Sequence, residues 1–177
     1  LLCGIIGIVS KSQVVDRLIN ALERLEYRGY DSSGLATVGN SKISCTKSPG
    51  KLISLKKKLK NEDIDGCVGI GHTRWATHGE PTETNAHPHL TKNIAVVHNG
   101  IIENFAELKK DLQGKGVTFN SQTDTEVVAQ LVERKISQDK CEPLEAVRLV
   151  VKQLSGSFAL CFIFRGTENL LIATRRG

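Results

Sequence analysis

The order of the apolar segments along this chain is the feature that most restricts its fold. Short apolar or β-branched runs predict strands, and longer runs with apolar residues every three or four positions predict helices. The predicted strands are residues 3–9, 35–38, 42–46, 66–73, 94–97, 158–164 and 170–174. The predicted helices are residues 14–26, 51–60, 102–112, 125–136 and 143–154. Regular βαβ alternation would build a doubly wound parallel sheet, so this mixed order instead favours stacked antiparallel sheets flanked by helices.

The length and charge of the chain limit its partners. Its 177 residues suit a single domain, and its net charge of +5 is modest. The densest group of lysines, in residues 51–60, alternates with leucines at helical spacing, which favours a solvated amphipathic helix over an anion-binding patch. Eight aromatic residues (one Trp, two Tyr and five Phe) do not interleave with basic ones as in a nucleic-acid platform. No apolar run approaches the roughly 18 residues of a membrane span, so neither nucleic acid nor a membrane is an expected partner.

The cysteines and histidines indicate neither a disulfide framework nor a metal centre. Five cysteines is an odd number, and no two of them have CxxC spacing. This pattern favours a reducing cytoplasm. His87 and His89 flank a proline in a predicted loop, with no carboxylate at an obvious ligand spacing. No zinc site is therefore expected, and no residue is assigned as a metal ligand.

Cys3 is the first candidate for chemistry. It lies within the first residues of the chain, followed by Gly4 and an apolar strand, which is a poor position for a structural thiol. If Cys3 became the first residue, its α-amino group, with a pKa of about 7.7–8.0, could accept the proton of the thiol. One residue would then supply both nucleophile and base. From position alone, a buried structural cysteine is an equal alternative.

Two further groups of residues each have a structural and a functional interpretation. Asn99-Gly100 follows a predicted strand, and this dipeptide favours a tight turn. It could also form an oxyanion hole from a side-chain amide and a backbone N–H. Arg74 and Asp124 could hold the carboxylate and ammonium groups of an amino acid. Taken singly, an ion pair for Arg74 and a helix N-cap for Asp124 are the better interpretations.

Several longer motifs, taken together, resemble one family. They occur in the order of the class II glutamine amidotransferases, a branch of the N-terminal-nucleophile hydrolases. Within this family they are most similar to the enzymes that make glucosamine 6-phosphate. The related glutaminases of purine, asparagine and glutamate synthesis share the Cys-Gly start but differ in the tyrosine-rich loop, Tyr27–Ser33, and in the Arg-Trp-Ala-Thr-His motif of residues 74–78. The motifs are Cys3–Ile8, Arg24–Ser32, His72–Pro81, Asn85–His89, Val97–Asn104 and Thr123–Glu126.

The resemblance implies a role for several individual residues. Cys3 matches the nucleophile, and Asn99 and Gly100 match the pair that stabilises the oxyanion. The positions that match those holding the α-carboxylate and α-ammonium groups of glutamine are Arg74, Thr77, His78 and Asp124. Trp75 matches a residue that gates the passage of ammonia, and Arg28 is expected to support the surroundings of the nucleophile. The remaining histidines are expected to organise loops.

The resemblance also implies the fold and the reaction. The expected fold class is α+β, in the four-layer αββα sandwich of the N-terminal-nucleophile hydrolases. Glutamine is hydrolysed to glutamate and ammonia through a γ-glutamyl thioester, without a metal or organic cofactor. The ammonia then serves to convert fructose 6-phosphate into glucosamine 6-phosphate, in the isomerase domains of a longer cytoplasmic enzyme. This parent enzyme is expected to be a homo-oligomer.

Two features depart from the pattern of the family. Leu1 and Leu2 precede Cys3, and the amide nitrogen of a Leu2–Cys3 bond is not basic, so no activity is expected until both are removed. The glutaminase domain of the family continues into further strands, so residues 1–177 are expected to be an incomplete glutaminase domain, truncated at its C-terminus and lacking the sugar-phosphate isomerase domains. If the leucines remain, the alternative is a catalytically inert fragment that binds glutamine or a partner.

Overall fold

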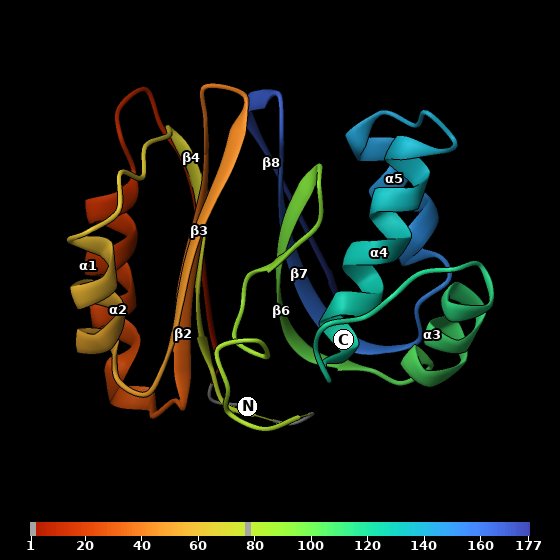
Figure 1. The fold of residues 1–177 in the computed structure, drawn as a ribbon, viewed down its shortest axis with the longest axis horizontal. Coiled ribbons are helices and arrows are strands. Elements are labelled where there is room, and N and C mark those ends of the chain that lie inside the picture. The colour runs from red at the N-terminus through yellow and green to blue at the C-terminus, as the bar shows by residue number, and fades with distance from the viewer. Residues whose placement is uncertain (1–2, 77–78) are drawn as a thin grey trace.

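The protein is a sandwich of four layers, with two antiparallel sheets in the middle and helices on both outer sides (Figure 1). The computed structural model describes residues 3–76 and 79–177. The first sheet has the strand order β1-β4-β2-β3, and the second has the order β5-β6-β7-β8. This arrangement confirms the predicted α+β class and the αββα layering.

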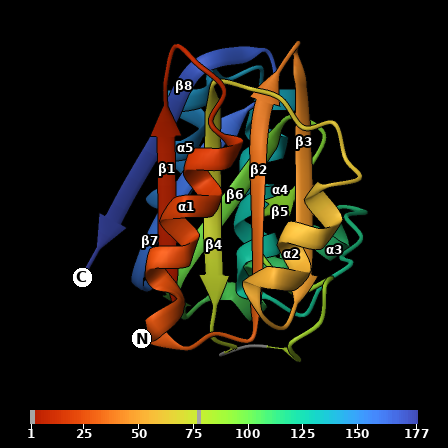
Figure 2. The ribbon, with the colours of Figure 1, turned by 90° about the vertical axis from the view of Figure 1, so that its left-hand side faces the viewer.

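The first sheet and its helices come from the N-terminal half of the chain. The strands are β1 (Gly4–Val9), β2 (Ser32–Gly39), β3 (Lys42–Pro49) and β4 (Val68–Arg74). Helices α1 (Val15–Leu25) and α2 (Leu52–Leu59) cover the outer face of this sheet (Figure 2), and a short 3₁₀ turn, Glu26–Arg28, follows α1. Leu18, Leu22 and Leu55 are fully buried beneath the two helices, so the amphipathic pattern of the lysine-rich segment has the predicted structural role.

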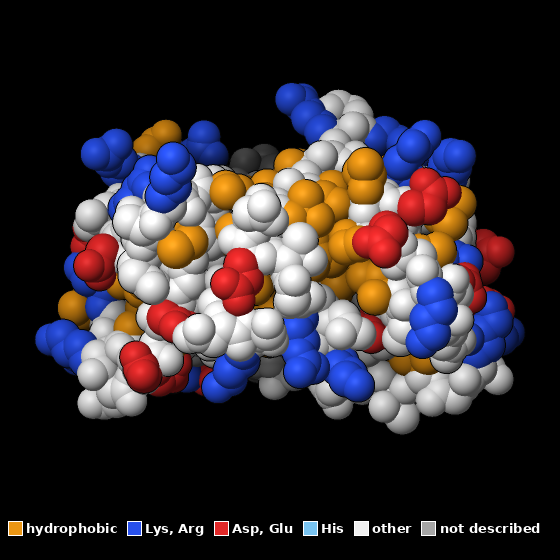
Figure 3. Space-filling model, turned by 90° about the horizontal axis from the view of Figure 1, so that it is seen from above, with side chains coloured by type: hydrophobic (Ala, Val, Ile, Leu, Met, Phe, Trp, Pro, Cys, Tyr) orange, Lys and Arg blue, Asp and Glu red, His pale blue; other side chains and the backbone are white. Residues whose placement is uncertain are grey.

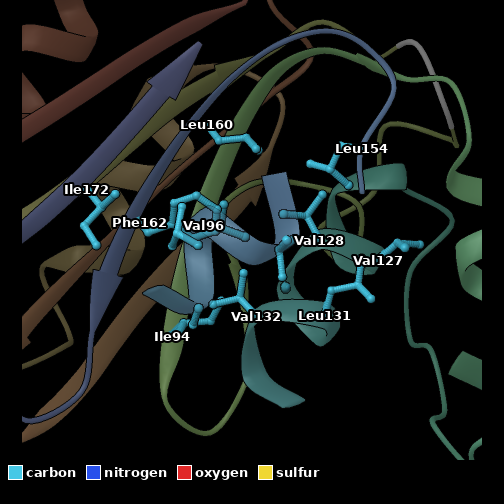
Figure 4. Packing of buried hydrophobic residues seen from close by; sticks show 14 of the residues in the cluster. Ile94, Val96, Val127, Val128, Leu131, Val132, Leu154, Leu160, Phe162 and Ile172 are labelled. Atoms are coloured by element: carbon cyan, nitrogen blue, oxygen red, sulfur yellow. The ribbon is translucent and has the colours of Figure 1, made fainter. Parts of the chain in front are cut away.

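The second sheet and its helices complete the sandwich. The strands are β5 (His89–Leu90), β6 (Ile94–Ile102), β7 (Gly156–Phe164) and β8 (Thr167–Arg176). The helices are α3 (Phe105–Gly114), α4 (Asp124–Ser137) and α5 (Pro143–Val151). Figure 4 shows the apolar cluster between this sheet and its helices, in which Val128, Val132 and Phe162 are fully buried. Burial of this apolar surface is the main force that holds the helices on the sheet.

A thinner apolar layer joins the two sheets. It contains Val38 and Ile70 from the first sheet, and Val97 and Ile163 from the second. Towards one end of the sandwich, polar side chains replace the apolar ones, including His72 on β4 and His98 on β6. Cys3, directly before β1, lies at this same end, because Gly4 pairs with Thr73 of β4.

Several predicted boundaries need correction. β2 begins at Ser32 rather than at residue 35, and β8 begins at Thr167 rather than at residue 170. The predicted long loop after β4 contains β5, a strand of two residues that was not predicted. Asp124 is the first residue of α4 and not its N-cap; the side chain of Thr123 caps the helix by accepting from the backbone N–H of Glu126.

The end of the molecule shown in Figure 3 carries charges of both signs. Lysine and arginine side chains lie over both helical layers and also along the edges of the middle, acidic side chains are interspersed among them, and apolar side chains are visible near the centre. Within residues 3–76 and 79–177, no helix is long and apolar enough to cross a membrane.

Candidate functional site

Cys3 lies directly before β1, where the backbone of Trp75 holds its thiol. The Sγ atom accepts a hydrogen bond from Trp75 N at 3.0 Å and lies 3.4 Å from the carbonyl oxygen of Trp75. The antiparallel pairing of β1 with β4 brings these residues together, and Gly4 N donates to Thr73 Oγ1 at 3.1 Å. Cys3 is only 8% exposed. The side chain of Cys3 is therefore fixed in place, as a nucleophile requires.

The surroundings of Cys3 make its thiol a weaker acid than usual. Burial raises the pKa of Cys3, the hydrogen bond from the Trp75 backbone lowers it, the charge of Asp31 raises it, and the charge of Arg74 lowers it, in that order of size. The net shift of the pKa is upward. At neutral pH the sulfur is therefore largely protonated, and a nucleophilic attack by Cys3 requires a base that accepts this proton.

Asn99 and Gly100 lie inside β6 and not in a tight turn, which corrects the structural interpretation of this dipeptide. Strand β6 continues to Ile102, and Asn99 and Gly100 pair with Ala159 and Phe158 of β7. The Asn99 Nδ2 atom donates to the backbone oxygen of Cys3 at 3.1 Å. Gly100 and Cys3 line the same cavity. The predicted oxyanion pair and the predicted nucleophile are therefore neighbours in space.

Four buried histidines lie behind Asn99, between the two sheets: His72, His87, His89 and His98. The ring of His72 stacks on that of His87 with centroids 4.2 Å apart, and His87 meets His89 edge-on at 4.9 Å. His98 Nδ1 lies 2.9 Å from Thr125 Oγ1, and His89 Nε2 lies 2.9 Å from Thr123 Oγ1. These rings join the loop before β5 to β4, β6 and the start of α4. Across the described part of the chain, no group of three or more His, Cys, Asp or Glu side chains could hold a metal ion.

Arg74 and Asp124 line the same small cavity as Cys3, and each is only 4% exposed. The guanidinium of Arg74 donates to the carbonyl oxygens of Glu80 at 3.1 Å and Gly79 at 3.4 Å, and lies 4.0 Å from Asp31. The Asp124 carboxylate accepts from Ile102 N at 2.9 Å. A cation and an anion therefore border the space beside the thiol, which suits a zwitterionic ligand.

The space beside Cys3 has two parts. The cavity with Arg74 and Asp124 has a volume of about 20 Å³, enough for about one water molecule. A larger cavity of about 630 Å³ lies on the other side of Cys3, and Arg28 and Asn99 border it. Trp75, which is 50% exposed, borders the smaller cavity next to the thiol. The smaller cavity must widen before an amino acid can occupy it.

Two of the predicted substrate-binding residues, Thr77 and His78, lie outside the described residues. The structure brings the other predicted site residues to the walls of the two cavities that meet at Cys3: Arg28, Arg74, Trp75, Asn99, Gly100 and Asp124.

Sequence reasoning assigned no individual role to Asp31, which supports the backbone around the thiol. Its Oδ2 atom accepts from Ala76 N at 2.5 Å, and its backbone N–H donates to Arg74 O at 2.7 Å. Asp31 therefore holds the segment whose Trp75 backbone contacts the sulfur of Cys3. Asp31 lies within the quoted tyrosine-rich motif, but no local spacing relates it to a residue 45 positions away.

Replacing Asp31 by asparagine should lower the pKa of the Cys3 thiol. The Asp31→Asn substitution keeps an oxygen that can accept from Ala76 N but removes a negative charge that disfavours the thiolate. The rate of alkylation of Cys3 is measured against pH by peptide mass spectrometry. In Asp31→Asn, the midpoint of this pH profile should move to lower pH. Asp111→Asn, on the exposed surface of α3, is the matched control and should leave the midpoint unchanged. A midpoint that stays or rises in Asp31→Asn would contradict this electrostatic role.

Comparison with known sequences gives one family match and several close relatives. Residues 72–176, more than half of the chain, match the family described as the glutamine amidotransferase domain. The glutamine–fructose-6-phosphate aminotransferase (isomerizing) of Mesorhizobium japonicum is 54% identical over 176 residues, and that of Brucella suis is 55% identical over the same number. Both alignments cover 99% of this chain, which spans only 29% of the length of either relative.

Solved structures show the same fold. The glutamine phosphoribosylpyrophosphate amidotransferase of B. subtilis, in complex with ADP and GMP, has a TM-score of 0.80 at 24% identity, covering 97% of this chain and 36% of that chain. A glutamine aminotransferase class-II domain protein of Silicibacter pomeroyi has a TM-score of 0.57 at 16% identity, covering 83% and 69%. These likenesses show the fold alone. The family match to residues 72–176 shows that the chain belongs to the glutamine amidotransferase family.

Proposed function

We propose that this chain hydrolyses glutamine to glutamate and ammonia, with Cys3 as its nucleophile. The observation that carries the proposal is the neighbourhood of Cys3: its carbonyl oxygen accepts from Asn99 Nδ2 at 3.1 Å, and its side chain lines a cavity with Gly100, Arg74 and Asp124. A nucleophile, two donors for an oxyanion and a pair of opposite charges are the parts that cleavage of an amino-acid amide requires.

Glutamine binds through its two charged ends in this proposal. The guanidinium of Arg74 holds the α-carboxylate, and the carboxylate of Asp124 holds the α-ammonium group. Thr77 and His78 complete this part of the site. The side-chain amide of glutamine then reaches the sulfur of Cys3, with its oxygen directed at Asn99 and Gly100. Arg28 supports the wall next to Cys3, and Trp75 controls the opening through which ammonia leaves.

The reaction proceeds in two halves and needs no redox partner. The α-amino group of a terminal Cys3 accepts the thiol proton, and the sulfur attacks the amide carbon, forming a C–S bond and an oxyanion. The oxyanion collapses, the C–N bond breaks, and ammonia leaves with the proton from the α-ammonium group. Water then attacks the γ-glutamyl thioester, the C–S bond breaks, and glutamate and the free thiol are released. One glutamine and one water thus give one glutamate and one ammonia.

The ammonia supplies a second reaction in a longer enzyme, as part of the same proposal. The relatives at 54% and 55% identity are aminotransferases of fructose 6-phosphate, and this chain spans 29% of their length. Residues 1–177 then belong to the glutaminase domain. The sugar-phosphate isomerase domains, which convert fructose 6-phosphate into glucosamine 6-phosphate, correspond to the rest of that length. The parent enzyme acts in the cytoplasm as a homo-oligomer; the five free cysteines suit a reducing compartment.

Labelling with a chloroketone analogue of glutamine tests the glutaminase site. In the chain that begins at Cys3, we expect one adduct by intact mass, localised to Cys3 by peptide mapping, and none in Cys3→Ala. Cys67→Ala, which removes a different partly exposed thiol, is the matched control and should label as fully as the parent. An excess of glutamine should protect Cys3, because it occupies the same site. Labelling of other cysteines at the same rate, or no protection by glutamine, would refute the proposed site.

A further inference from the structure

We propose that His72 is a positioning residue that fixes the orientation of the Asn99 amide, so that its NH₂ group faces the developing oxyanion. The inference rests on the proposed function and deepens it, because it assigns the part of the oxyanion site that lies behind the donor. His72 lies on β4, in the first sheet, whereas Asn99 lies on β6, in the second. The contact between them therefore couples the two halves of the sandwich at the site.

The tautomer of His72 follows from its neighbours. Its Nε2 atom lies 3.0 Å from the carbonyl oxygen of His98, which can only accept a hydrogen bond. Nε2 therefore carries the proton. The same Nε2–H lies 2.8 Å from the Asn99 side chain, so the amide atom that faces it must be the oxygen, Oδ1. The NH₂ group of Asn99 then points the other way, where Nδ2 donates to Cys3 O.

The burial of His72 keeps this arrangement constant. The residue is 1% exposed, and its ring stacks on that of His87 at an angle of 16°. Burial lowers the pKa of His72 to about 4, so the ring stays neutral through the physiological range. A neutral ring has a single N–H, and the stacking on His87 holds it towards both the His98 carbonyl oxygen and the Asn99 side chain.

The effect of His72 on catalysis depends on which end of the Asn99 side-chain amide faces the oxyanion. With Nδ2 towards the site, one of its N–H bonds can serve Cys3 O and the other the developing negative oxygen. A rotation of the amide by half a turn would put Oδ1 there instead, and two oxygens would repel each other. Without His72, the hydrogen bond to Cys3 O is the only one within residues 3–76 and 79–177 that opposes this rotation of the Asn99 amide. Loss of the His72 donor should therefore cost about 10- to 100-fold in kcat, less than the roughly 100- to 1,000-fold for loss of an oxyanion donor itself.

Two amide substitutions of His72 separate the loss of the hydrogen-bond donor at Nε2 from the change in side-chain size. In His72→Gln the amide nitrogen can occupy the position of Nε2, whereas in His72→Asn it reaches only the position of Nδ1. The assay is glutamate release by the chain that begins at Cys3, with kcat and KM measured for both variants and thermal unfolding recorded for each. His72→Asn should lose about 10- to 100-fold in kcat with KM changed less than about 3-fold, and His72→Gln should keep kcat within about 3-fold of the parent.

A double-mutant cycle with Asn99→Ala separates positioning from a general loss of structure. If His72 acts through Asn99, His72→Asn should add less than about 2-fold to the loss of kcat in Asn99→Ala. An equal loss in both backgrounds, or a kcat of His72→Asn equal to that of the parent, would overturn the inference. If His72→Asn does not fold, His72→Phe keeps a ring on His87 without the donor and takes its place in the cycle. A separate outcome would refute the proposed function itself: a parent chain that is not labelled by the glutamine analogue at Cys3 and does not hydrolyse glutamine.

Discussion

A chain that begins at Cys3 should hydrolyse glutamine about 100- to 10,000-fold faster than the same chain with Leu1 and Leu2 in place. This factor is what general base catalysis typically contributes. The pKa of the Cys3 thiol is raised, chiefly by burial, so little thiolate is present without a base at neutral pH. A free α-amino group accepts the proton, whereas the amide nitrogen of a Leu2–Cys3 bond does not. Glutamate release by the two chains, at equal concentration and saturating glutamine, measures the difference.

The pH dependence of the rate identifies this base. The α-amino group must be unprotonated to accept the thiol proton, so kcat/KM should rise with pH through the pKa of the amine, which is about 7.7–8.0 when unperturbed. The chain that retains the leucines should lack this rise below the pKa of the thiol. A chain that begins at Cys3 and has Cys67→Ala is the control, because that thiol lies directly before β4, at the opposite end of the strand from Arg74; its profile should match the parent. Equal rates for the long and the short chain would rule out the α-amino group as the base.

The layers of the fold follow from local patterns, and sequence reasoning predicted them well. The spacing of apolar residues distinguished strands from helices. The predicted order of β1, α1, β2, β3, α2 and β4 is confirmed. The pattern of fully buried leucines on α1 and α2 is a property of each helix alone. Boundaries were less accurate: β2 extends to Ser32 because its first residues pair with β3 and β4, and pairing partners are not visible in a local window.

The interior of the site could not be predicted in the same way, because it depends on contacts between distant segments. Asn99-Gly100 has the sequence of a turn, yet β7 pairs with both residues and keeps the strand extended. His72 and His98 are separated by 26 positions, and only the stacking of two sheets brings the ring of one to the carbonyl of the other. The proposed roles of Cys3 and Arg74 came from a resemblance to a family, since their local sequence allowed structural alternatives.

The Gly100→Ala substitution should lower the free energy of unfolding of the protein and impair the proposed oxyanion site. Gly100 has φ = 117°, a conformation that L side chains rarely adopt, and a Cβ atom there would lie 2.2 Å from the backbone oxygen of Ser157. The strained backbone costs about 1–3 kcal/mol, and the overpacking costs a further amount of about 1–3 kcal/mol. For a chain of this length, that total lowers Tm by roughly 5–20 °C. Thermal unfolding followed by circular dichroism measures the shift.

The same substitution should affect catalysis beyond its effect on stability. The nearest obstacle to the new Cβ is the backbone of β7, which is paired along β6 and cannot move like the end of a flexible side chain. β6 must therefore shift, and a displacement of about 1 Å at a reacting group costs about 100-fold in rate. Gly114→Ala is the matched control: no atom lies within 4 Å of its added Cβ, and alanine favours a helix over glycine by about 0.5–1 kcal/mol. Gly114→Ala should keep kcat and leave Tm unchanged or a few degrees higher. The Gly100→Ala variant is assayed about 20 °C below its Tm, so that the chain is folded. If its kcat then equals that of the parent, Gly100 takes no part in the site.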